Sequence, residues 1–372
     1  MPGFPAARAI RVTHIRIDVS TESAAYPILV QPGLHRSLAT LLDQQQFSPN
    51  RFVISSPTVW NLHGAAIRRG LRRTEVILIP DGERAKTLGT VQRIYDALVR
   101  AHADRGSGLI GIGGGVVGDV AGFAAASYLR GIPIVHVPTT LLAQVDSAVG
   151  GKVGVNHPLG KNLIGAFHQP RLVAVDPAVL ATLPRREFRA GLYEVVKYGM
   201  AFEAPLFERV RTNLRSIIAQ DLGALTPVIA ESCRIKAGVV MQDERERGPR
   251  RLLNFGHTAG HALEAVTKYR RFRHGEAIAW GMLVAADVSV ARGALHEDGR
   301  QALAGVISAL GPLPAVTDLR SSDALAAMRR DKKVVNGRLH FVIVTDVGRA
   351  QVVDDVTEKE LTAALIRVGL KR

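Results

Sequence analysis

Three histidines in the second half of the chain are candidates for a metal site. His257 and His261 are four positions apart in the helical pattern HTAGHALEAV, so both imidazoles are expected on one side of a helix. His274 follows the charged connection KYRRFR, which could bring a second helix beside the first. Two imidazoles and a carboxylate that leave coordination positions open suit catalytic zinc or a similar divalent ion. Position 258 is Thr where zinc proteases of the H-E-x-x-H type carry Glu, which disfavours a protease.

Glu194 is the candidate for the carboxylate ligand. It lies in the apolar segment GLYEVVKYGM with Lys197 three residues later, so both side chains share one face of a predicted helix. A charged pair inside an apolar helix is hard to explain by packing alone, because buried charges are costly. Two alternatives stay open at this stage. Each histidine can be a hydrogen-bonded core residue, and Glu194 can form a simple ion pair with Lys197.

A glycine-rich turn in the first half of the chain is a candidate cofactor site. The segment LIGIGGGVVGD indicates a strand, a tight turn and a helix, and Gly113, Gly115 and Gly118 satisfy the G-x-G-x-x-G pattern. The free N–H groups at the start of such a helix suit a pyrophosphate. The acidic residue that usually follows about 20 positions later is missing, because that region reads IPIVHVPTT. We therefore expect either a non-standard dinucleotide site or a purely structural turn.

The apolar patterns predict two parts that position these residues. From Arg11 to about Asp176, runs rich in Val and Ile alternate with helix-length segments, which predicts a mostly parallel α/β sheet. The strands on either side of STESAA are expected to pair antiparallel. From about Arg189 to Gly311 amphipathic helical segments dominate, and only RLHFVIVT and RAQVV near the end indicate strands. We expect an α/β domain over residues 1–184 and a mainly helical domain over residues 185–372.

Composition limits the class of protein. With 372 residues and 47% hydrophobic content, the chain can bury a large core. No segment approaches the roughly 20 uncharged apolar residues of a membrane span, and the N-terminus lacks the apolar region of a signal peptide, so we expect a cytoplasmic protein with no membrane partner. The single cysteine, Cys233, cannot form an internal disulfide and is expected in the core. The net charge is +15, but the basic residues are dispersed, so we expect no nucleic-acid partner.

Several segments together resemble the 3-dehydroquinate synthase family of sugar-phosphate cyclases. They occur in that family's order and touch most of the chain from about Pro80 to Leu339: PDGERAKT, GGGVVGDVAGFAAASYLRG, VPTTLLAQVDSAVGGKVGVNHPLGKNLIGAFHQP, GLYEVVKYG, DERERGPRRLLNFGHTAGHALEA, HGEAIAWGM and RDKKVVNGRL. The run from Val137 to Pro170 is far more specific than any short motif. The resemblance implies an N-terminal α/β domain that binds NAD, a helical C-terminal domain that binds metal and substrate, an active site between them, and a homodimer.

The resemblance also implies roles for particular residues. The family's ligands for a divalent metal, zinc or cobalt, match Glu194, His257 and His274. Its cofactor positions match Glu83, Lys86, Gly114, Gly115, Val116, Asp119, Thr139, Thr140, Lys161 and Thr182. Its substrate positions match Asp146, Lys152, Asn162, Lys197, Lys236, Arg250, Asn254, His261 and one of Lys332 or Lys333, and Arg130 matches the residue that reaches the substrate phosphate from the neighbouring subunit. The chain departs from the family at Ser55 and Ser56, where many members carry an Asp that contacts the cofactor ribose.

The reaction that this resemblance implies converts 3-deoxy-D-arabino-heptulosonate 7-phosphate, an anionic sugar phosphate, into 3-dehydroquinate and phosphate. NAD oxidises a ring hydroxyl, phosphate leaves by β-elimination, the hydride returns, and an intramolecular aldol step closes the ring. A metal lowers the pKa of the reacting hydroxyl, and fixed cations hold the substrate in position. His261 is implied as a proton relay, with Asp146 and Lys197 as orienting partners.

Two alternative functions share parts of this pattern. A cyclase for sedoheptulose 7-phosphate or glucose 6-phosphate also uses NAD and a metal, but its substrate lacks the carboxylate that Lys236 and Arg250 are implied to face; a bidentate Arg suits that carboxylate. A metal-dependent alcohol or glycerol-phosphate dehydrogenase has a similar two-domain plan and releases NADH at the end of each turnover.

Overall fold

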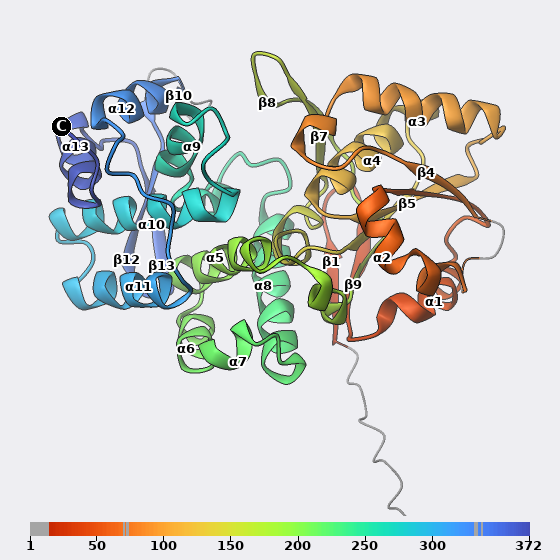
Figure 1. Cartoon of the computed structure of the whole chain (residues 1–372), viewed down its shortest axis with the longest axis horizontal. Helices are drawn as coiled ribbons and strands as arrows, with labels where there is room; N and C mark the ends of the chain where they lie inside the picture. Colours follow the sequence, from red (N-terminus) through yellow and green to blue (C-terminus); the bar gives the residue numbers. More distant parts are fainter. Residues whose placement is uncertain (1–14, 70, 72–73, 331–333, 336–337) are drawn as a thin grey trace, which may run out of the picture.

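The computed structural model describes residues 15–69, 71, 74–330, 334–335 and 338–372, and it has an α/β part followed by a helical part (Figure 1). Seven strands form one sheet in the order β1-β2-β9-β6-β5-β3-β4. β1 pairs with β2 antiparallel, and the other neighbours pair parallel, as the sequence predicts. The strand bounds are β1 Ile15–Ser20, β2 Ala25–Val30, β3 Asn50–Ser55, β4 Glu75–Leu78, β5 Ser107–Gly113, β6 Ile134–Pro138 and β9 Leu172–Val175.

Helices cover both faces of the sheet because successive strand residues point to opposite sides. Phe52 and Leu109 lie in the core with α3 and α4, whereas their chain neighbours Val53 and Ile110 lie in the core with α1 and α2. These central strands are therefore apolar on both faces, as expected of a covered parallel sheet. The bounds of the helices are α1 Leu38–Gln44, α2 Pro57–Arg68, α3 Leu88–Arg100 and α4 Gly115–Ser127.

The carboxyl ends of the parallel strands form the edge where the predicted cofactor residues gather. From β3 the chain crosses to β4 on one side and then returns to β5 on the other side of β3. Such a reversal is a topological switch point, where open α/β sheets bind ligands in the crevice beyond the strand ends. The segments that follow β4, β5, β6 and β9 carry most of the predicted cofactor residues, namely Glu83, Lys86, Gly114, Gly115, Val116, Asp119, Thr139, Thr140 and Thr182.

An antiparallel hairpin is the main element that the apolar patterns do not predict. It consists of β7 (Lys152–His157) and β8 (Gly160–Phe167), and it stands on the side of the α/β part that faces the helical part (Figure 1). Its two strands approach very closely at Gly154, where an added Cβ would lie 2.4 Å from the Ile164 carbonyl oxygen. The hairpin carries three predicted site residues, Lys152, Lys161 and Asn162, which the fold thereby places at the junction of the two parts.

Helices dominate after residue 184, as predicted, and they share one core with β1, β2 and β9. Cys233 is buried in this core, where its Sγ donates to the Gln144 carbonyl oxygen (3.2 Å) and burial raises the pKa of the thiol to about 12. It is a core residue, as expected. Among the described helices, none has the length and apolar character needed to cross a membrane. The bounds are α5 Arg185–Ala201, α6 Ala204–Thr212, α7 Leu214–Ile218, α8 Leu222–Gln242, α9 His257–Val266, α10 His274–Ala291, α11 Glu297–Ala309, α12 Ser321–Arg329, α13 Glu358–Arg367, β10 Val334–Val335, β11 Arg338–Leu339, β12 Phe341–Asp346 and β13 Arg349–Val353.

Candidate metal and cofactor site

Three helices bring the predicted metal ligands together. Glu194 comes from α5, His257 from the start of α9 and His274 from the start of α10. The Glu194 Oε1 atom lies 3.9 Å from the His257 Nε2 atom and 3.7 Å from the His274 Nε2 atom. Ligand atoms on a tetrahedral zinc ion with bonds of about 2.1 Å are about 3.4 Å apart. The three side chains are therefore almost at coordinating distance without any rearrangement of the helices.

Close packing of α10 on α5 makes this approach possible. Gly275, directly after His274, lies so near α5 that an added Cβ would be 1.9 Å from the Ala190 carbonyl oxygen. Any other residue at position 275 would push the start of α10 away from the helix that carries Glu194. The glycine therefore sets the distance between His274 and Glu194, and it is a packing requirement next to a predicted metal ligand.

Both candidate histidines are oriented through their Nδ1 atoms. The His257 Nδ1 lies 3.2 Å from the Phe255 carbonyl oxygen, and the His274 Nδ1 lies 3.5 Å from the Glu264 Oε2 atom. Partners of this kind fix the tautomer and direct Nε2 toward a metal. Burial lowers the pKa of His274, but the hydrogen bond and charge of Glu264 and the charge of Glu194 outweigh it, so the pKa is raised overall.

The burial and contacts of Glu194 fit those of a metal ligand. Its carboxylate is fully buried, and within the described part of the chain neither oxygen accepts a hydrogen bond, although the Lys197 ammonium forms an ion pair with Oε2. A buried carboxylate is normally satisfied by hydrogen bonds, because burying an unsatisfied one is costly. Lys197 pairs with Oε2, so a divalent cation would supply the partner of Oε1, and the donor set fits the group that the family implies.

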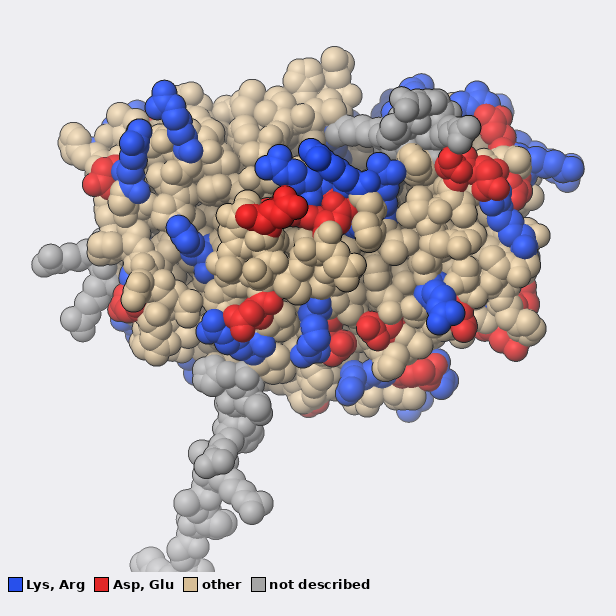
Figure 2. Space-filling view, turned by 180° about the vertical axis from the view of Figure 1, so that it is seen from behind, with Lys and Arg blue, Asp and Glu red and all other residues tan. Residues whose placement is uncertain are grey.

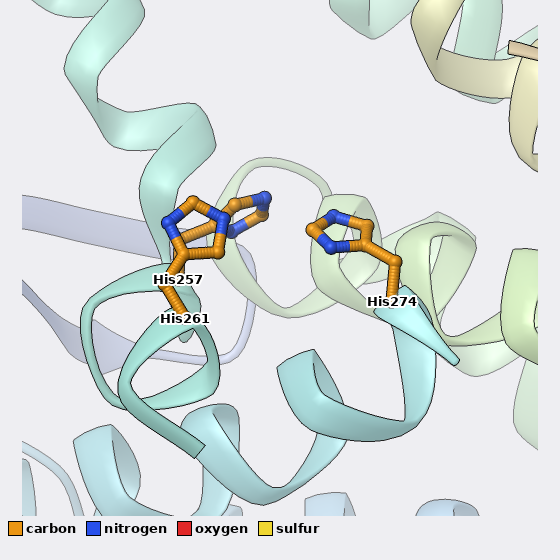
Figure 3. A group of neighbouring side chains, drawn as sticks. All are labelled: His257, His261 and His274. Atoms are coloured by element: carbon orange, nitrogen blue, oxygen red, sulfur yellow. The ribbon is translucent and has the colours of Figure 1, made fainter. Parts of the chain in front are cut away.

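His261 lies in the same cluster. The imidazoles of His257, His261 and His274 face a common space (Figure 3), and one nitrogen of each lies within 4.8 Å of the others. The ring centroids of His257 and His261 are 5.3 Å apart, and those of His261 and His274 are 5.8 Å apart. His261 is therefore close enough either to join the metal ligands or to act beside them. Its assignment to the substrate stays a prediction.

Asp146, Lys236 and Tyr198 form a second cluster beside α5. The Lys236 ammonium donates to both the side chain and the carbonyl of Asp146 (2.6 Å to the carbonyl), and the Tyr198 hydroxyl donates to Asp146 Oδ1 (2.7 Å). Burial alone would raise the pKa of Asp146. The positive charges of Lys236 and Lys197 and the hydrogen bonds from Lys236 and Tyr198 have a larger, opposite effect, so the pKa of Asp146 is well below its usual range. Burial in turn lowers the pKa of Lys236. Asp146 is thus held ionised among cations.

Lys152 and Asn254 are both bound by one acidic side chain. Glu246 forms an ion pair with Lys152 and accepts a hydrogen bond from the Asn254 side-chain amide (3.0 Å). Its backbone has φ +59°, which is unusual for a residue other than glycine. An anionic group therefore already lies on two of the residues that the resemblance assigns to the substrate.

Arg250 is almost completely buried, and its guanidinium is tied to the main chain. Its Nη atoms donate to the carbonyl oxygens of Gly150 (3.0 Å) and Glu244, and its Nε is buried without a hydrogen-bond partner among the described residues. The guanidinium also lies 5.9 Å from the Phe167 ring centroid. The side chain therefore joins the loop after α8 to the start of the hairpin, in addition to any role at the substrate.

The glycine turn after β5 is packed against the next strand end. An added Cβ at Gly114 would lie 2.9 Å from the Thr140 side chain, so the two predicted cofactor segments are in close contact and a larger residue at position 114 would displace Thr140. Beside it, the Lys86 ammonium donates to both Asp119 and Asn162. Lys86 thus links the cofactor edge of the sheet to the hairpin.

Ser55 and Ser56 have structural roles, and a carboxylate lies next to them. The Ser55 hydroxyl donates to the Ile112 carbonyl oxygen (2.8 Å), and the Ser56 hydroxyl caps α2 by accepting from the Val59 N–H. Asp81, from the loop after β4, accepts from the Thr58 hydroxyl (2.8 Å). Partial burial raises the pKa of Asp81, but hydrogen bonds from Ser56 and Thr58 outweigh it and lower the pKa. An ionised carboxylate is therefore present at the end of β3 although the strand itself supplies none.

The predicted residues Arg130 and Thr182 are each the last residue of a short helical turn, Tyr128–Arg130 and Pro177–Thr182. Arg130 is exposed in the turn after α4, with φ +70°. The Thr182 hydroxyl lies 3.0 Å from the His63 Nε2 atom and donates to the Val179 carbonyl oxygen. Lys332 and Lys333 lie outside the described residues. On the face shown in Figure 2, basic side chains are spread over both parts of the molecule, and several lie beside acidic ones.

Comparison with known proteins decides the family. The profile described as 3-dehydroquinate synthase N-terminal matches residues 76–190, and the profile described as 3-dehydroquinate synthase C-terminal matches residues 191–334. The chain belongs to the 3-dehydroquinate synthase family. A 3-dehydroquinate synthase of Pelotomaculum thermopropionicum is 46% identical over 341 residues, covering 90% of this chain and 92% of its own length. One of Gloeobacter violaceus is 45% identical, covering 94% and 98%.

Solved structures of other enzymes share the overall fold of this chain. A 2-epi-5-epi-valiolone synthase of Streptomyces hygroscopicus with NAD⁺ and Zn²⁺ bound superposes with a TM-score of 0.85 at 30% identity, over 94% of this chain and 98% of that chain. A 2-deoxy-scyllo-inosose synthase in complex with carbaglucose-6-phosphate, NAD⁺ and Co²⁺ superposes with the same TM-score at 25% identity, over 94% and 99%. A probable glycerol dehydrogenase of Sinorhizobium meliloti shares the fold alone, at 17% identity and a TM-score of 0.62.

Four residues of the site are not among those predicted from the sequence: Asp81, Tyr198, Glu246 and Glu264. Glu264 had a local signal, because it lies three residues after His261 and therefore on the same face of α9. Tyr198 directly follows Lys197. Asp81 and Glu246 gave no signal, since their partners Thr58 and Lys152 are 23 and 94 residues away along the chain.

Proposed function

We propose that this chain carries out the reaction of its family, the conversion of 3-deoxy-D-arabino-heptulosonate 7-phosphate into 3-dehydroquinate and phosphate, with NAD and a divalent metal as cofactors. This reaction is a phosphate-eliminating lyase step of the shikimate pathway. The family match over both halves of the chain supports the reaction. The approach of Glu194 Oε1 to two histidine Nε2 atoms is the structural observation that carries the metal requirement. When bound, NAD takes up and returns a hydride, and the metal lowers the pKa of the hydroxyl that it coordinates.

In this proposal Glu194, His257 and His274 hold the metal, zinc or cobalt, and the carboxyl edge of the sheet holds NAD. The cofactors in the solved structures of 2-epi-5-epi-valiolone synthase (NAD⁺ and Zn²⁺) and 2-deoxy-scyllo-inosose synthase (NAD⁺ and Co²⁺) support both assignments. The NAD contacts are assigned to the residues after the strand ends and to Lys161, with Asp81 supplying the carboxylate that Ser55 and Ser56 lack. The position of this edge at the topological switch point favours the assignment.

The substrate is assigned to the polar and charged residues around the metal. Lys152, Asn162, Asn254 and His261 hold the phosphate, together with Arg130 of a second copy of the chain. Asp146 and Lys197 orient the reacting hydroxyl, and the low pKa of Asp146 keeps this carboxylate able to accept a hydrogen bond at neutral pH. Lys236 and Arg250 are assigned to the substrate carboxylate, and one of Lys332 or Lys333 to the same pocket.

Three further features belong to the proposal. The chain is organised as an NAD-binding domain over residues 1–184 and a metal- and substrate-binding domain over residues 185–372; the family profiles change at residue 191, close to this boundary. The protein is a homodimer, because Arg130 is assigned to the neighbouring active site. It acts in the cytoplasm, without a membrane or nucleic-acid partner.

Phosphate release tests the proposed reaction. The purified protein is given the heptulosonate phosphate with substoichiometric NAD, with and without a chelator, beside sedoheptulose 7-phosphate. We expect phosphate and 3-dehydroquinate from the heptulosonate alone, many turnovers per NAD, loss of activity with chelator and recovery with Zn²⁺ or Co²⁺. Turnover of sedoheptulose 7-phosphate alone would contradict the substrate, and steady accumulation of NADH would indicate a dehydrogenase.

A further inference from the structure

One buried carboxylate lies between the metal site and the hairpin. Glu264, on α9, is 4% exposed, and its two oxygens contact different parts of the molecule. Oε2 lies 3.5 Å from the Nδ1 atom of His274, and Oε1 lies 3.6 Å from the ammonium of Lys161. His274 belongs to the helical part, whereas Lys161 belongs to β8 of the hairpin. A single side chain therefore bridges the two parts of the chain next to the predicted metal.

Glu264 gives His274 an orientation that the main chain does not provide. His257 is held by a carbonyl of its own turn, that of Phe255 (3.2 Å), but the Nδ1 partner of His274 is the Glu264 carboxylate. Carboxylate partners of this kind hold the imidazole in one tautomer and make the other nitrogen a better ligand. The Nε2 atom of His274 then faces Glu194 Oε1 at 3.7 Å.

The Lys161 side of the contact leads to the cofactor edge. The Lys161 ammonium lies 4.1 Å from the ring centroid of Tyr269, in the connection between α9 and α10, so it is held by both a carboxylate and an aromatic face. The next residue, Asn162, accepts a hydrogen bond from Lys86. The hairpin is also bound to the Lys86 loop by the main chain, since the Asn156 N–H donates to the Lys86 carbonyl oxygen (2.9 Å).

We propose that Glu264 is a positioning residue that couples the occupancy of the metal site to that of the cofactor site. This inference rests on the proposed function, because it takes His274 as a metal ligand and Lys161 and Lys86 as cofactor contacts. A metal on His274 fixes the imidazole and, through it, Glu264. Lys161 then pairs with a carboxylate that is already fixed, so the hairpin is ordered before NAD binds. NAD binding therefore costs less conformational entropy and is tighter. By linkage, NAD tightens metal binding by the same factor.

Binding measurements on Glu264→Gln test the coupling. Glutamine keeps the shape of the side chain but removes the charge that Lys161 and His274 share. Cobalt affinity is measured by titrating metal-free protein and following the visible absorption of Co²⁺, and NAD affinity is measured by calorimetry with and without Co²⁺. In the wild type we expect Co²⁺ to tighten NAD binding about fivefold or more. In Glu264→Gln we expect cobalt affinity to fall about 10- to 100-fold. The coupling factor is the ratio of the NAD affinity at saturating Co²⁺ to the NAD affinity without Co²⁺, and in this variant we expect it to approach one.

A second variant separates the two contacts of Glu264. Lys161→Met leaves the Glu264–His274 contact in place, so cobalt affinity in the absence of NAD should stay within about twofold of wild type, while the coupling factor should still approach one. NAD itself is expected to bind more weakly in both metal states, and the ratio of the two affinities removes this effect. Lys161 is on a partly exposed hairpin, so this variant tests the coupling even if Glu264→Gln does not fold.

Asp287→Asn is the matched control. Asp287 is also a buried carboxylate of the helical part, paired with Arg300 (2.9 Å), but it lies toward the far end of α10. We expect it to lower stability without changing cobalt affinity or the coupling factor. Wild-type coupling in Lys161→Met, or wild-type cobalt affinity in Glu264→Gln, would overturn the inference. Failure of the proposed function is a different result, because the wild type would then release no phosphate from the heptulosonate.

Discussion

Replacing Lys236 by Met is expected to destabilise the protein by leaving Asp146 without its closest cation. Removing one partner of a fully buried ion pair costs about 3–5 kcal/mol. The side chain of Lys236 is 8% exposed, whereas that of Asp146 is 23% exposed. Water can therefore partly solvate the Asp146 carboxylate after Lys236 is removed, which reduces the loss of stability. Methionine retains most of the packing of the lysine stem, and Tyr198 still donates to Asp146. We therefore expect a loss of about 2–3 kcal/mol in the free energy of unfolding at neutral pH.

The assay is urea unfolding of metal-free protein, followed by tryptophan fluorescence and circular dichroism. Arg234→Met is the matched control, because Arg234 is on the same helix, two residues before Lys236, and pairs with Glu231 at the surface. The control should lose less than about 0.5 kcal/mol. The double variant Lys236→Met with Asp146→Asn should lose less than Lys236→Met alone, since no unpaired charge then stays buried.

The pH dependence gives an independent check on the same pair. In the wild type the pKa of Asp146 lies below its unfolded value of about 3.9, so the stability that the pair contributes is present above that value and is lost only as pH falls toward the folded pKa. Without Lys236, burial is the dominant influence and raises the pKa of Asp146. The difference between variant and wild type should therefore shrink as pH falls from 7 to 4. A constant difference, or one no larger than that of Arg234→Met, would refute the reasoning.

Three further perturbations have defined outcomes. Arg250→Met removes the ties to Gly150 and Glu244 and should raise the KM for the heptulosonate about tenfold or more with metal content unchanged; metal loss by elemental analysis would mean that Arg250 supports the metal site instead. Glu246→Gln removes the negative charge that pairs with Lys152 and competes with phosphate for it. Inorganic phosphate should therefore inhibit at a several-fold lower concentration, and an unchanged inhibition constant would contradict this. Asp81→Asn should weaken NAD binding by about tenfold in calorimetry with no change in cobalt affinity; equal weakening of both would point to misfolding.

The sequence predicts the strands of the main sheet because their residues form apolar runs of strand length, separated by helix-length segments. It also predicts the metal residues individually, since Glu194 and the histidines are polar groups in apolar helical patterns. Spacing could not show that Glu194 meets His257 and His274, because these residues come from three helices, and His274 reaches Glu194 through the packing of α10 on α5 at Gly275. The family resemblance was needed to connect them.

The hairpin and its partners show what local patterns cannot predict. Gly154 in β7 and the exposed residues of β8 break the alternation of apolar and polar residues that is typical of a half-buried strand. From the sequence, the segment from Lys152 to Phe167 is therefore recognisable only as part of a family motif and not as a hairpin. The contacts of Lys161 with Glu264 and of Lys152 with Glu246 join residues about 100 positions apart. Such ion pairs depend on tertiary structure, and their members look like ordinary surface charges in the sequence.

Anomalous diffraction at the zinc edge tests the central assignment most directly. Crystals of the protein loaded with Zn²⁺ are measured on both sides of the absorption edge. We predict one strong peak within about 2.0–2.2 Å of a Glu194 oxygen and of the Nε2 atoms of His257 and His274. A peak held by His257, His261 and His274, with Glu194 bound only to Lys197, would contradict the proposed ligand set.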